Sequence, residues 1–136
     1  MPVAIKPVTL RPALKWAGGK RWQVPHLKPL WKAHEHRRLA EPFCGGLAVS
    51  LGLAPARAVL NDANPHLINF YRRLQRGLRI DLPMENDEGQ FYAHRERFNS
   101  LLTSGKLATK EAASLFYYLN RNDASQSVPG LPFASA

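Results

Sequence analysis

Cysteine and long apolar segments are scarce in this sequence, and each shortage excludes a class of protein. Its 136 residues include one cysteine, Cys44, so an internal disulfide and a multi-cysteine zinc site are both excluded. A reducing, intracellular setting and a cytoplasmic location are therefore expected. The longest uncharged run, residues 42–56, is shorter than the ~20 apolar residues that a membrane-spanning helix needs. No secretory signal or membrane anchor is predicted.

Acidic residues are scarce in the first half of the chain. Residues 1–60 hold 10 Lys and Arg against 2 acids, whereas residues 61–136 hold 9 against 8. This asymmetry indicates that a face of the first half meets a polyanion such as nucleic acid. An ordinary basic surface is the alternative. The length and the hydrophobic fraction of 45% are those of a globular chain with one domain.

Hydrophobic patterning predicts an α/β arrangement in the first half. A short strand over residues 38–43 is followed by a glycine turn, an apolar helix over 47–53 and a buried strand over 58–60. This order is typical of the first half of a parallel α/β layer. Upstream, residues 21–32 have partial helical spacing, and Pro25 and Pro29 are expected to break or bound that helix.

Three helices are predicted in the second half. The first begins at Asn64, a good N-cap, with Pro65 at the first helical position, and it ends at Gly77. The second runs through residues 91–102. The third is capped by Thr109 and carries an apolar stripe through residues 112–119.

The turn after the first strand and an acid after the second strand form the most informative pattern. A strand that ends in a glycine turn, here Glu41 to Gly46, brings bare backbone N–H groups close to a ligand. Asp62 follows Glu41 by 62 − 41 = 21 residues, the spacing at which an acid binds a ribose diol. Because a full G-x-G-x-x-G is missing, the pattern predicts a nucleoside-containing cofactor without a pyrophosphate. A structural turn without a ligand is the alternative.

Residues 15–20, Lys-Trp-Ala-Gly-Gly-Lys, form a second pattern. A tryptophan beside two glycines offers a flat apolar wall that a ligand can approach closely, between two cations. The spacing is not that of a P-loop. A structural turn with Trp16 in the core is the alternative here. His34 and His36 are interpreted as part of a solvated basic loop, so no metal site is predicted.

Four segments resemble, in order, the DNA adenine-N6 methyltransferases of the Dam-like class. They are LKWAGGK, LAEPFCGGLAVSL, LNDANPHLINFYRRLQ and AASLFYYLNR, and the resemblance covers residues 13–121. It implies site-specific methylation of adenine N6 in double-stranded DNA, with S-adenosylmethionine (SAM) as methyl donor and a restriction–modification role among the possible settings. The implied fold is α/β, a partial Rossmann-like SAM-binding layer followed by a small helical segment.

The resemblance also implies residue roles. The SAM-binding positions that it indicates are Trp16, Gly18, Gly19, Lys20, Glu41, Phe43, Gly45 and Asp62. Among them, Asp62 matches the acid that holds the ribose hydroxyls, and Lys15 matches a position that faces DNA. The family often reads Phe-x-Gly-x-Gly, and this chain has Leu47 at the fifth position. The implied division is a SAM-binding part in residues 1–80, the start of a helical target-recognition region in 81–121, and a disordered non-family tail in 122–136.

One family motif is missing from this sequence. Dam-like enzymes hold the N6 amine of the extruded adenine with Asp-Pro-Pro-Tyr. The chain has 11 prolines and no two of them are adjacent. We therefore expect a truncated chain that is inactive alone, needs a complementing carboxy-terminal chain, and leaves a parallel sheet edge exposed. The alternative function is a small basic nucleic-acid-binding module without enzymatic activity.

Overall fold

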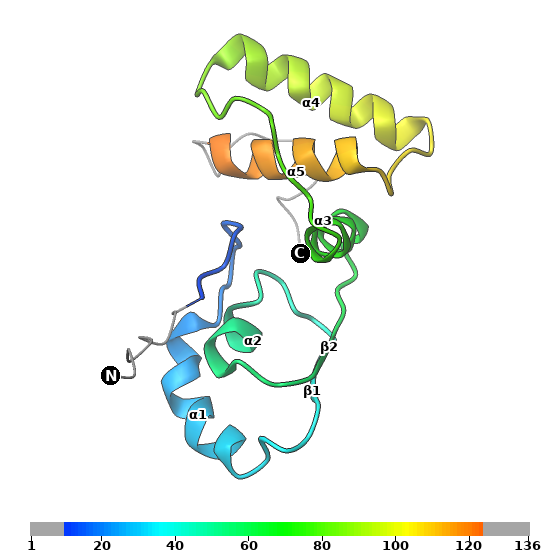
Figure 1. The fold of residues 1–136 in the computed structure, drawn as a ribbon. Coiled ribbons are helices and arrows are strands. Elements are labelled where there is room, and N and C mark those ends of the chain that lie inside the picture. Colours follow the sequence, from blue (N-terminus) through cyan, green and yellow to red (C-terminus); the bar gives the residue numbers. More distant parts are fainter. Residues whose placement is uncertain (1–9, 124–136) are drawn as a thin grey trace, which may run out of the picture. The chain divides into compact units, whose positions relative to one another are not determined.

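The computed structural model describes residues 10–123, which fall into two compact units divided between Ala63 and Asn64. The elements in chain order are η1 (Arg21–Gln23), α1 (Val24–Lys32), β1 (Leu39–Glu41), α2 (Ala48–Leu53), β2 (Ala58–Leu60), α3 (Pro65–Gln75), α4 (Glu88–Thr103) and α5 (Lys110–Asn122) (Figure 1). The first unit contains two parallel strands and the helices beside them, and the second unit contains three helices. The chain is therefore of the mixed α/β class, with a small parallel sheet.

The first unit is built around two parallel strands. β1 pairs with β2 in the register Leu39↔Ala58 and Glu41↔Leu60, and α2 is the crossover between them. The order of strand, glycine turn, helix and strand is the one predicted from the sequence. Because both strands run in the same direction, their carboxyl ends lie at the same edge of the sheet.

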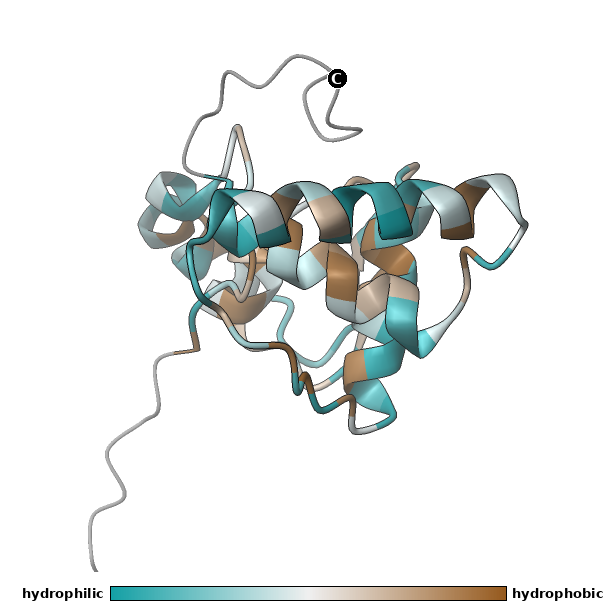
Figure 2. Ribbon diagram, turned by 90° about the horizontal axis from the view of Figure 1, so that it is seen from above, coloured by the Kyte–Doolittle hydropathy of each residue, from teal (hydrophilic) through white to brown (hydrophobic). Residues whose placement is uncertain are grey.

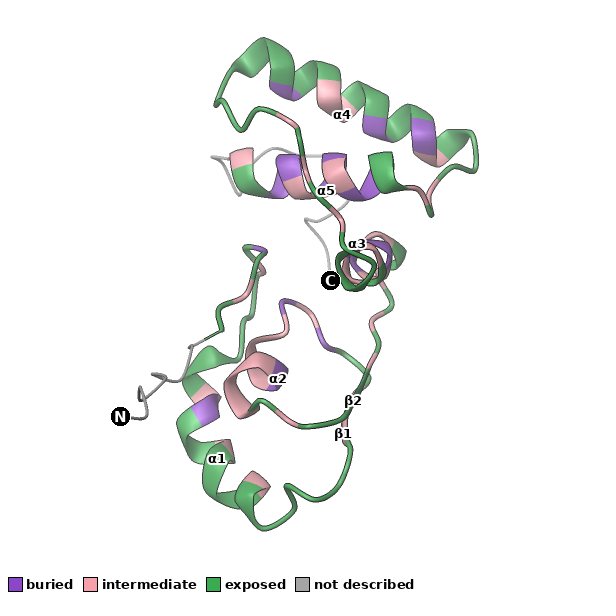
Figure 3. Cartoon of the chain, in the orientation of Figure 1, coloured by how far each residue is buried: buried purple, intermediate pink, exposed green. Residues whose placement is uncertain are grey.

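This sheet is covered poorly for a parallel one. Ala40, Ala58 and Val59 are exposed, Val59 to 47% of its surface, whereas parallel sheets are normally buried on both faces. The prediction that residues 58–60 form a buried strand was therefore wrong. Figure 3 shows the same contrast along the chain, with few buried residues around β1 and β2. Within residues 10–123 the sheet has two strands, so the predicted exposed parallel edge is confirmed.

The prediction that proline breaks the first helix was wrong for Pro29. α1 runs without interruption through Pro29, while Pro25 lies in its first turn, where proline is tolerated. Pro29 has no N–H to donate to the carbonyl of Pro25, four residues earlier. Because Pro25 is exposed, water can hydrate that carbonyl, and the helix continues.

α1 packs closely on α2 at a glycine. A Cβ atom on Gly52 would lie 2.6 Å and 2.7 Å from the two γ-carbons of Val24, a residue of the buried core. At this position the two helices lie so close together that a side chain larger than that of glycine would not fit. This contact places α2, and with it the preceding turn, against α1.

The second unit is a three-helix arrangement with a core of large aromatic side chains. α5 packs against both α3 and α4. Phe70, Phe98, Phe116 and Tyr118 are almost fully buried among these helices. Figure 2 shows denser apolar residues along α5 and more hydrophilic ones along α4. The apolar stripe predicted for the last helix is therefore confirmed as core.

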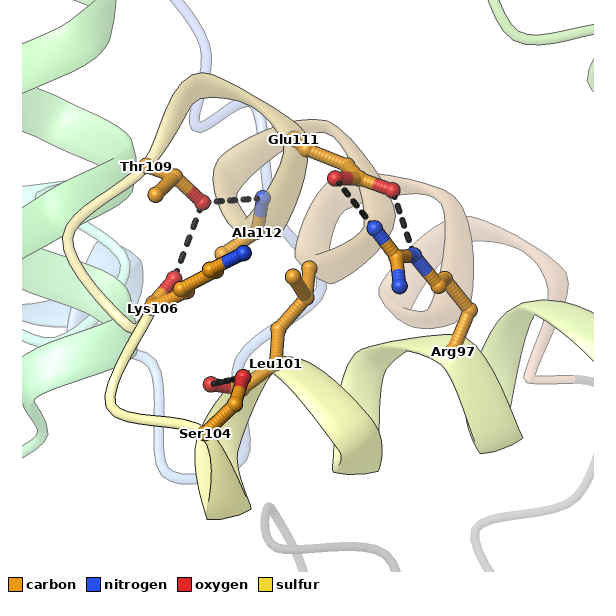
Figure 4. Close-up of polar contacts among 7 residues, drawn as sticks. All are labelled: Arg97, Leu101, Ser104, Lys106, Thr109, Glu111 and Ala112. Carbon is orange, nitrogen blue, oxygen red and sulfur yellow. Dashed lines mark hydrogen bonds and ion pairs between the residues drawn. The ribbon is translucent and has the colours of Figure 1, made fainter.

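The helix starts agree with the predicted capping residues. The Asn64 side chain accepts hydrogen bonds from the backbone N–H groups of His66 and Leu67, and Pro65 is the first residue of α3. Thr109 accepts from the N–H of Ala112. Arg97 of α4 and Glu111 of α5 also form an ion pair with two hydrogen bonds, which joins these two helices (Figure 4).

α3 belongs to the helical unit by its contacts. The Asn69 side chain donates to the Thr109 carbonyl at 3.0 Å, and Arg73 donates to the Ala108 carbonyl. The assignment of residues 1–80 and 81–121 to cofactor binding and target recognition stays a prediction about roles. Of the predicted tail, residues 124–136 lie outside the described part of the chain.

Candidate functional site

The carboxyl ends of β1 and β2 are joined through the turn that follows β1. The backbone N–H of Cys44 donates to the Asn61 carbonyl at 2.8 Å. The next N–H, that of Gly45, donates to Oδ2 of Asp62 at 3.0 Å. Gly45 and Asp62, 17 residues apart in the sequence, therefore lie in direct contact. Both N–H groups have partners within the protein, so the expectation that they are bare toward a ligand was wrong.

Trp16 lies against the same turn. A Cβ atom on Gly45 would lie 2.9 Å from Cδ1 and 3.0 Å from Nε1 of the indole, and one on Gly46 would lie 3.0 Å from the Trp16 Cβ. Gly45 also has φ +47°, a left-handed conformation that favours glycine. Both glycines are thus required by space, and one of them also by backbone geometry. Trp16 is half-buried, so residues 15–20 lie beside the glycine turn, and a role of this segment in binding a ligand stays a prediction.

Glu41 closes the turn from the other side. Its Oε2 accepts hydrogen bonds from the backbone N–H of Ser50, at 3.1 Å, and from the Ser50 hydroxyl. Ser50 is the third residue of α2, where an N–H has no partner within the helix. The carboxylate therefore caps α2 and is favoured there by the positive end of the helix dipole. Sequence analysis missed Ser50; its signal was a hydroxyl residue in the first turn of a helix that begins without a capping side chain.

Leu47 adopts a backbone conformation that favours glycine. Its φ is +63°, left-handed, and it immediately precedes α2. Left-handed backbone costs a residue with a side chain about 1–2 kcal/mol. At the position where the sequence departs from Phe-x-Gly-x-Gly, Leu47 therefore carries a strain that glycine would not have.

Cys44 is poorly suited to act as a nucleophile. Burial, together with the nearby carboxylates of Asp62 and Glu41, raises the pKa of its thiol from 9.0 to about 11. The thiol is thus protonated near neutral pH, and a thiolate is the form that reacts. Its role is to fill the inside of the turn, where it is buried.

The remaining predicted positions lie around this turn or in the preceding loop. The Phe43 ring points away from the protein and is 85% exposed. Gly18 and Gly19 are exposed, and Gly18 has φ +71°. Lys15 and Lys20 are exposed, and Lys20 stands at the start of η1.

Among the described residues, neither a metal site nor a membrane-spanning helix is found. Within residues 10–123, no three His, Cys, Asp or Glu side chains are grouped so that they could hold a metal ion. No helix of this part has both the length and the apolar character that crossing a membrane requires. A hollow lies at the amino ends of the strands, away from the turn, and is lined by Lys28, Trp31, Lys32, Glu35 and residues 53–56.

Comparisons with known proteins show the family of this chain. The family described as D12 class N6 adenine-specific DNA methyltransferase matches residues 16–128. A type II methyltransferase of Lactococcus lactis subsp. cremoris is 46% identical over 68 residues, 50% of this chain and 24% of that protein. A retron DNA adenine methylase of Escherichia coli is 33% identical over 116 residues, 80% of this chain and 39% of the relative.

A DNA adenine methylase of Haemophilus influenzae is 33% identical over 124 residues, which cover 82% of this chain and 40% of that protein. The chain therefore spans less than half the length of each of these relatives. No solved structure matches it. The family match includes both the tryptophan turn and the glycine turn that the structure brings together. On this evidence the chain belongs to the D12 class N6 adenine-specific DNA methyltransferases.

Proposed function

We propose that the turn after β1 binds SAM, and that the chain is the cofactor-binding part of an enzyme that methylates adenine N6 in double-stranded DNA. The observation that carries this proposal is that Gly45 donates its N–H to Asp62 and packs against Trp16 on the side where a side chain would lie. Three segments far apart in the sequence thus form one surface. They are the segments whose residues resemble the SAM-binding motifs of the family.

The residues present fit the chemistry of SAM. Asp62 stands at the carboxyl end of β2 and offers carboxylate oxygens to ribose hydroxyls, the role of an acid at this place in dinucleotide-binding folds. The exposed Phe43 ring offers an apolar surface for an adenine. When bound, SAM supplies a methyl group on a sulfonium sulfur. This chain's own residues hold and orient the cofactor, and Trp16, Gly18, Gly19 and Lys20 form the adjoining wall.

Glu41 has a positioning role in this proposal. Its carboxylate is engaged by Ser50 and fixes the first turn of α2 relative to the end of β1. This arrangement sets the spacing between the glycine turn and the helix, so Glu41 shapes the cofactor surface in addition to any contact with the cofactor itself.

We also propose that the two described strands are part of a larger Rossmann-like sheet. A parallel pair with exposed Ala40 and Val59 lacks the cover that such sheets have in other proteins. A complementing carboxy-terminal segment, in the same or another chain, would cover these strands and bring Asp-Pro-Pro-Tyr. Without that motif, nothing in this sequence can hold the N6 amine in line with the methyl group, so residues 1–136 alone are inactive.

Family membership removes one version of the alternative function. A basic binding module unrelated to enzymes is not compatible with a family match over residues 16–128. DNA binding without catalysis by the isolated chain is compatible with it, and Lys15 is the residue proposed to face DNA near the cofactor.

Methyl transfer to duplex DNA tests the function. The purified chain is incubated with labelled SAM and DNA, alone and together with the carboxy-terminal part of a family member that carries Asp-Pro-Pro-Tyr. We expect no N6-methyladenine from either part and detectable product from the mixture. Methylation by the chain alone would refute the need for a complement. Saturable SAM binding that is unaffected by changes at Asp62 would refute the proposed site.

Asp62 is tested with two substitutions. Asp62→Ala loses two charge-assisted hydrogen bonds to the ribose, so SAM affinity is expected to fall by about 2–4 kcal/mol, roughly 30- to 1000-fold. Asp62→Asn keeps an oxygen that can accept from the Gly45 N–H, and it is the matched control for the shape of the turn. Calorimetry that shows unchanged affinity for Asp62→Ala would contradict the assignment.

A further inference from the structure

The amino ends of β1 and β2 carry a cluster of cations at the opposite end of the sheet from the glycine turn. Residues 33–38 lead into β1 and residues 54–57 lead into β2 (Figure 1). The Leu39 N–H donates to the Arg57 carbonyl at 3.0 Å, and the Arg57 side chain donates to the His36 carbonyl at 3.3 Å. These two loops are therefore held together as one surface.

We call this surface the basic end, and it consists of Lys28 and Lys32 of α1 together with Arg37, Arg38 and Arg57. These are five of the nine Lys and Arg residues between positions 10 and 63. All five are exposed. Glu35 is the acid among residues 28–38. In the described part of the chain, no carboxylate lies within ion-pair distance of any of the five.

The shape of the basic end suits an extended ligand. Lys28, Trp31, Lys32 and Glu35 line an open hollow together with residues 53–56, so one acid lies among its cations. Lys28 and Lys32 are four residues apart, so they lie on one face of α1. Arg37 and Arg38 continue the positive charge beyond the hollow along the loop. A row of exposed cations suits the phosphate backbone of duplex DNA, which Lys and Arg side chains bind by charge.

We propose that the basic end binds the phosphodiester backbone of DNA without reading its sequence, at a place separate from the cofactor turn. Each strand has three residues, and the acidic groups Glu41 and Asp62 lie at the other end of the sheet. A DNA segment at the basic end is thus held by charge alone, flanking or separate from the segment that meets the methyl donor. The inference rests on the proposed function for its choice of DNA as the polyanion.

DNA binding of a fourfold variant tests the proposal. Lys28→Gln, Lys32→Gln, Arg37→Gln and Arg38→Gln are combined, and Arg57 is left intact because its side chain supports the loop at residue 36. Affinity for a fluorescent duplex of arbitrary sequence is measured against salt concentration. The control combines Arg72→Gln, Arg76→Gln, Arg79→Gln and Lys110→Gln, four exposed cations of the helical unit that give the same change in net charge.

The variant should lose affinity roughly 10- to 100-fold at 0.1 M salt if at least two cations meet phosphates. The slope of log affinity against log salt should become less steep by about one for each such contact. The control should lose much less. Equal losses in the two variants would overturn the proposal. Competition by polyglutamate is measured as well, and polyglutamate that binds this surface as tightly as DNA does and displaces it would also overturn the proposal.

SAM binding separates this proposal from the proposed function. The fourfold variant should bind SAM like the unmodified chain, because none of its substitutions lies in the glycine turn or at Asp62. If SAM fails to bind either chain while the difference in DNA affinity is seen, the cofactor proposal fails and the basic end stands. If SAM binds both and the DNA affinities are equal, the basic end fails alone.

Discussion

Replacing Gly45 by alanine tests whether the tryptophan segment and the glycine turn form one surface. Two costs add at this position. The left-handed backbone, φ +47°, costs alanine about 1–2 kcal/mol. The new Cβ would lie 2.9 Å from Cδ1 of Trp16, closer than an ordinary contact, and such overpacking typically costs about 1–3 kcal/mol. The expected loss of unfolding free energy is therefore about 2–5 kcal/mol.

Two neighbouring glycines separate these costs. Gly18 has φ +71° and no atom within 4 Å of its added Cβ, so Gly18→Ala should show the backbone cost alone. Gly46 has no left-handed φ but lies against the Trp16 Cβ at 3.0 Å, so Gly46→Ala should show the contact cost alone. Urea unfolding of the three variants is the assay. A Gly45→Ala loss no larger than that of Gly18→Ala would refute the placement of the indole.

Three further predictions concern the turn and the helical unit. Leu47→Gly should be more stable than Leu47→Ala by about 0.5–1 kcal/mol, because φ is +63° there; urea unfolding that gives the usual order, alanine above glycine, would contradict this. Alkylation of Cys44 at pH 8 should be roughly 100-fold slower in the folded chain than in urea, because a pKa of about 11 leaves about 0.1% thiolate against about 10%; equal rates would show an accessible thiol. Burial lowers the pKa of His66, whose Nδ1 is buried without a partner among the described residues, so the folded state disfavours the proton. Stability should thus be complete above about pH 6.5 and fall as the pH decreases below it; His66→Phe should flatten this pH dependence in urea midpoints, and an unchanged profile would argue against the assignment.

Local chemistry made part of this structure predictable. Asn64 and Thr109 start helices because their side chains satisfy backbone N–H groups two or three residues away, a relation that the sequence shows directly. The contact between the glycine turn and Asp62 was predictable in outline. The acid follows a strand parallel to the one that ends in the turn, and the carboxyl ends of such strands meet at one edge.

Contacts between distant segments were not predictable from spacing. Nothing in the order of residues shows that the Trp16 indole fills the place of a Cβ at Gly45, since this depends on how residues 10–20 pass the sheet. Ser50 was missed because its partner, Glu41, belongs to another element. Pro29 was misjudged because the effect of a lost helix hydrogen bond depends on exposure, which only the structure shows.

The central claim, that Trp16, the glycine turn and Asp62 together form a SAM-binding surface, is tested most directly by NMR on the isotope-labelled chain. During a SAM titration, the Gly45 amide and the Trp16 indole N–H resonances should shift together and saturate at one affinity. The Gly77 and Gly105 amides, in turns of the helical unit, should stay in place. Saturable binding that moves other resonances and leaves Gly45 and Trp16 unchanged would contradict the account.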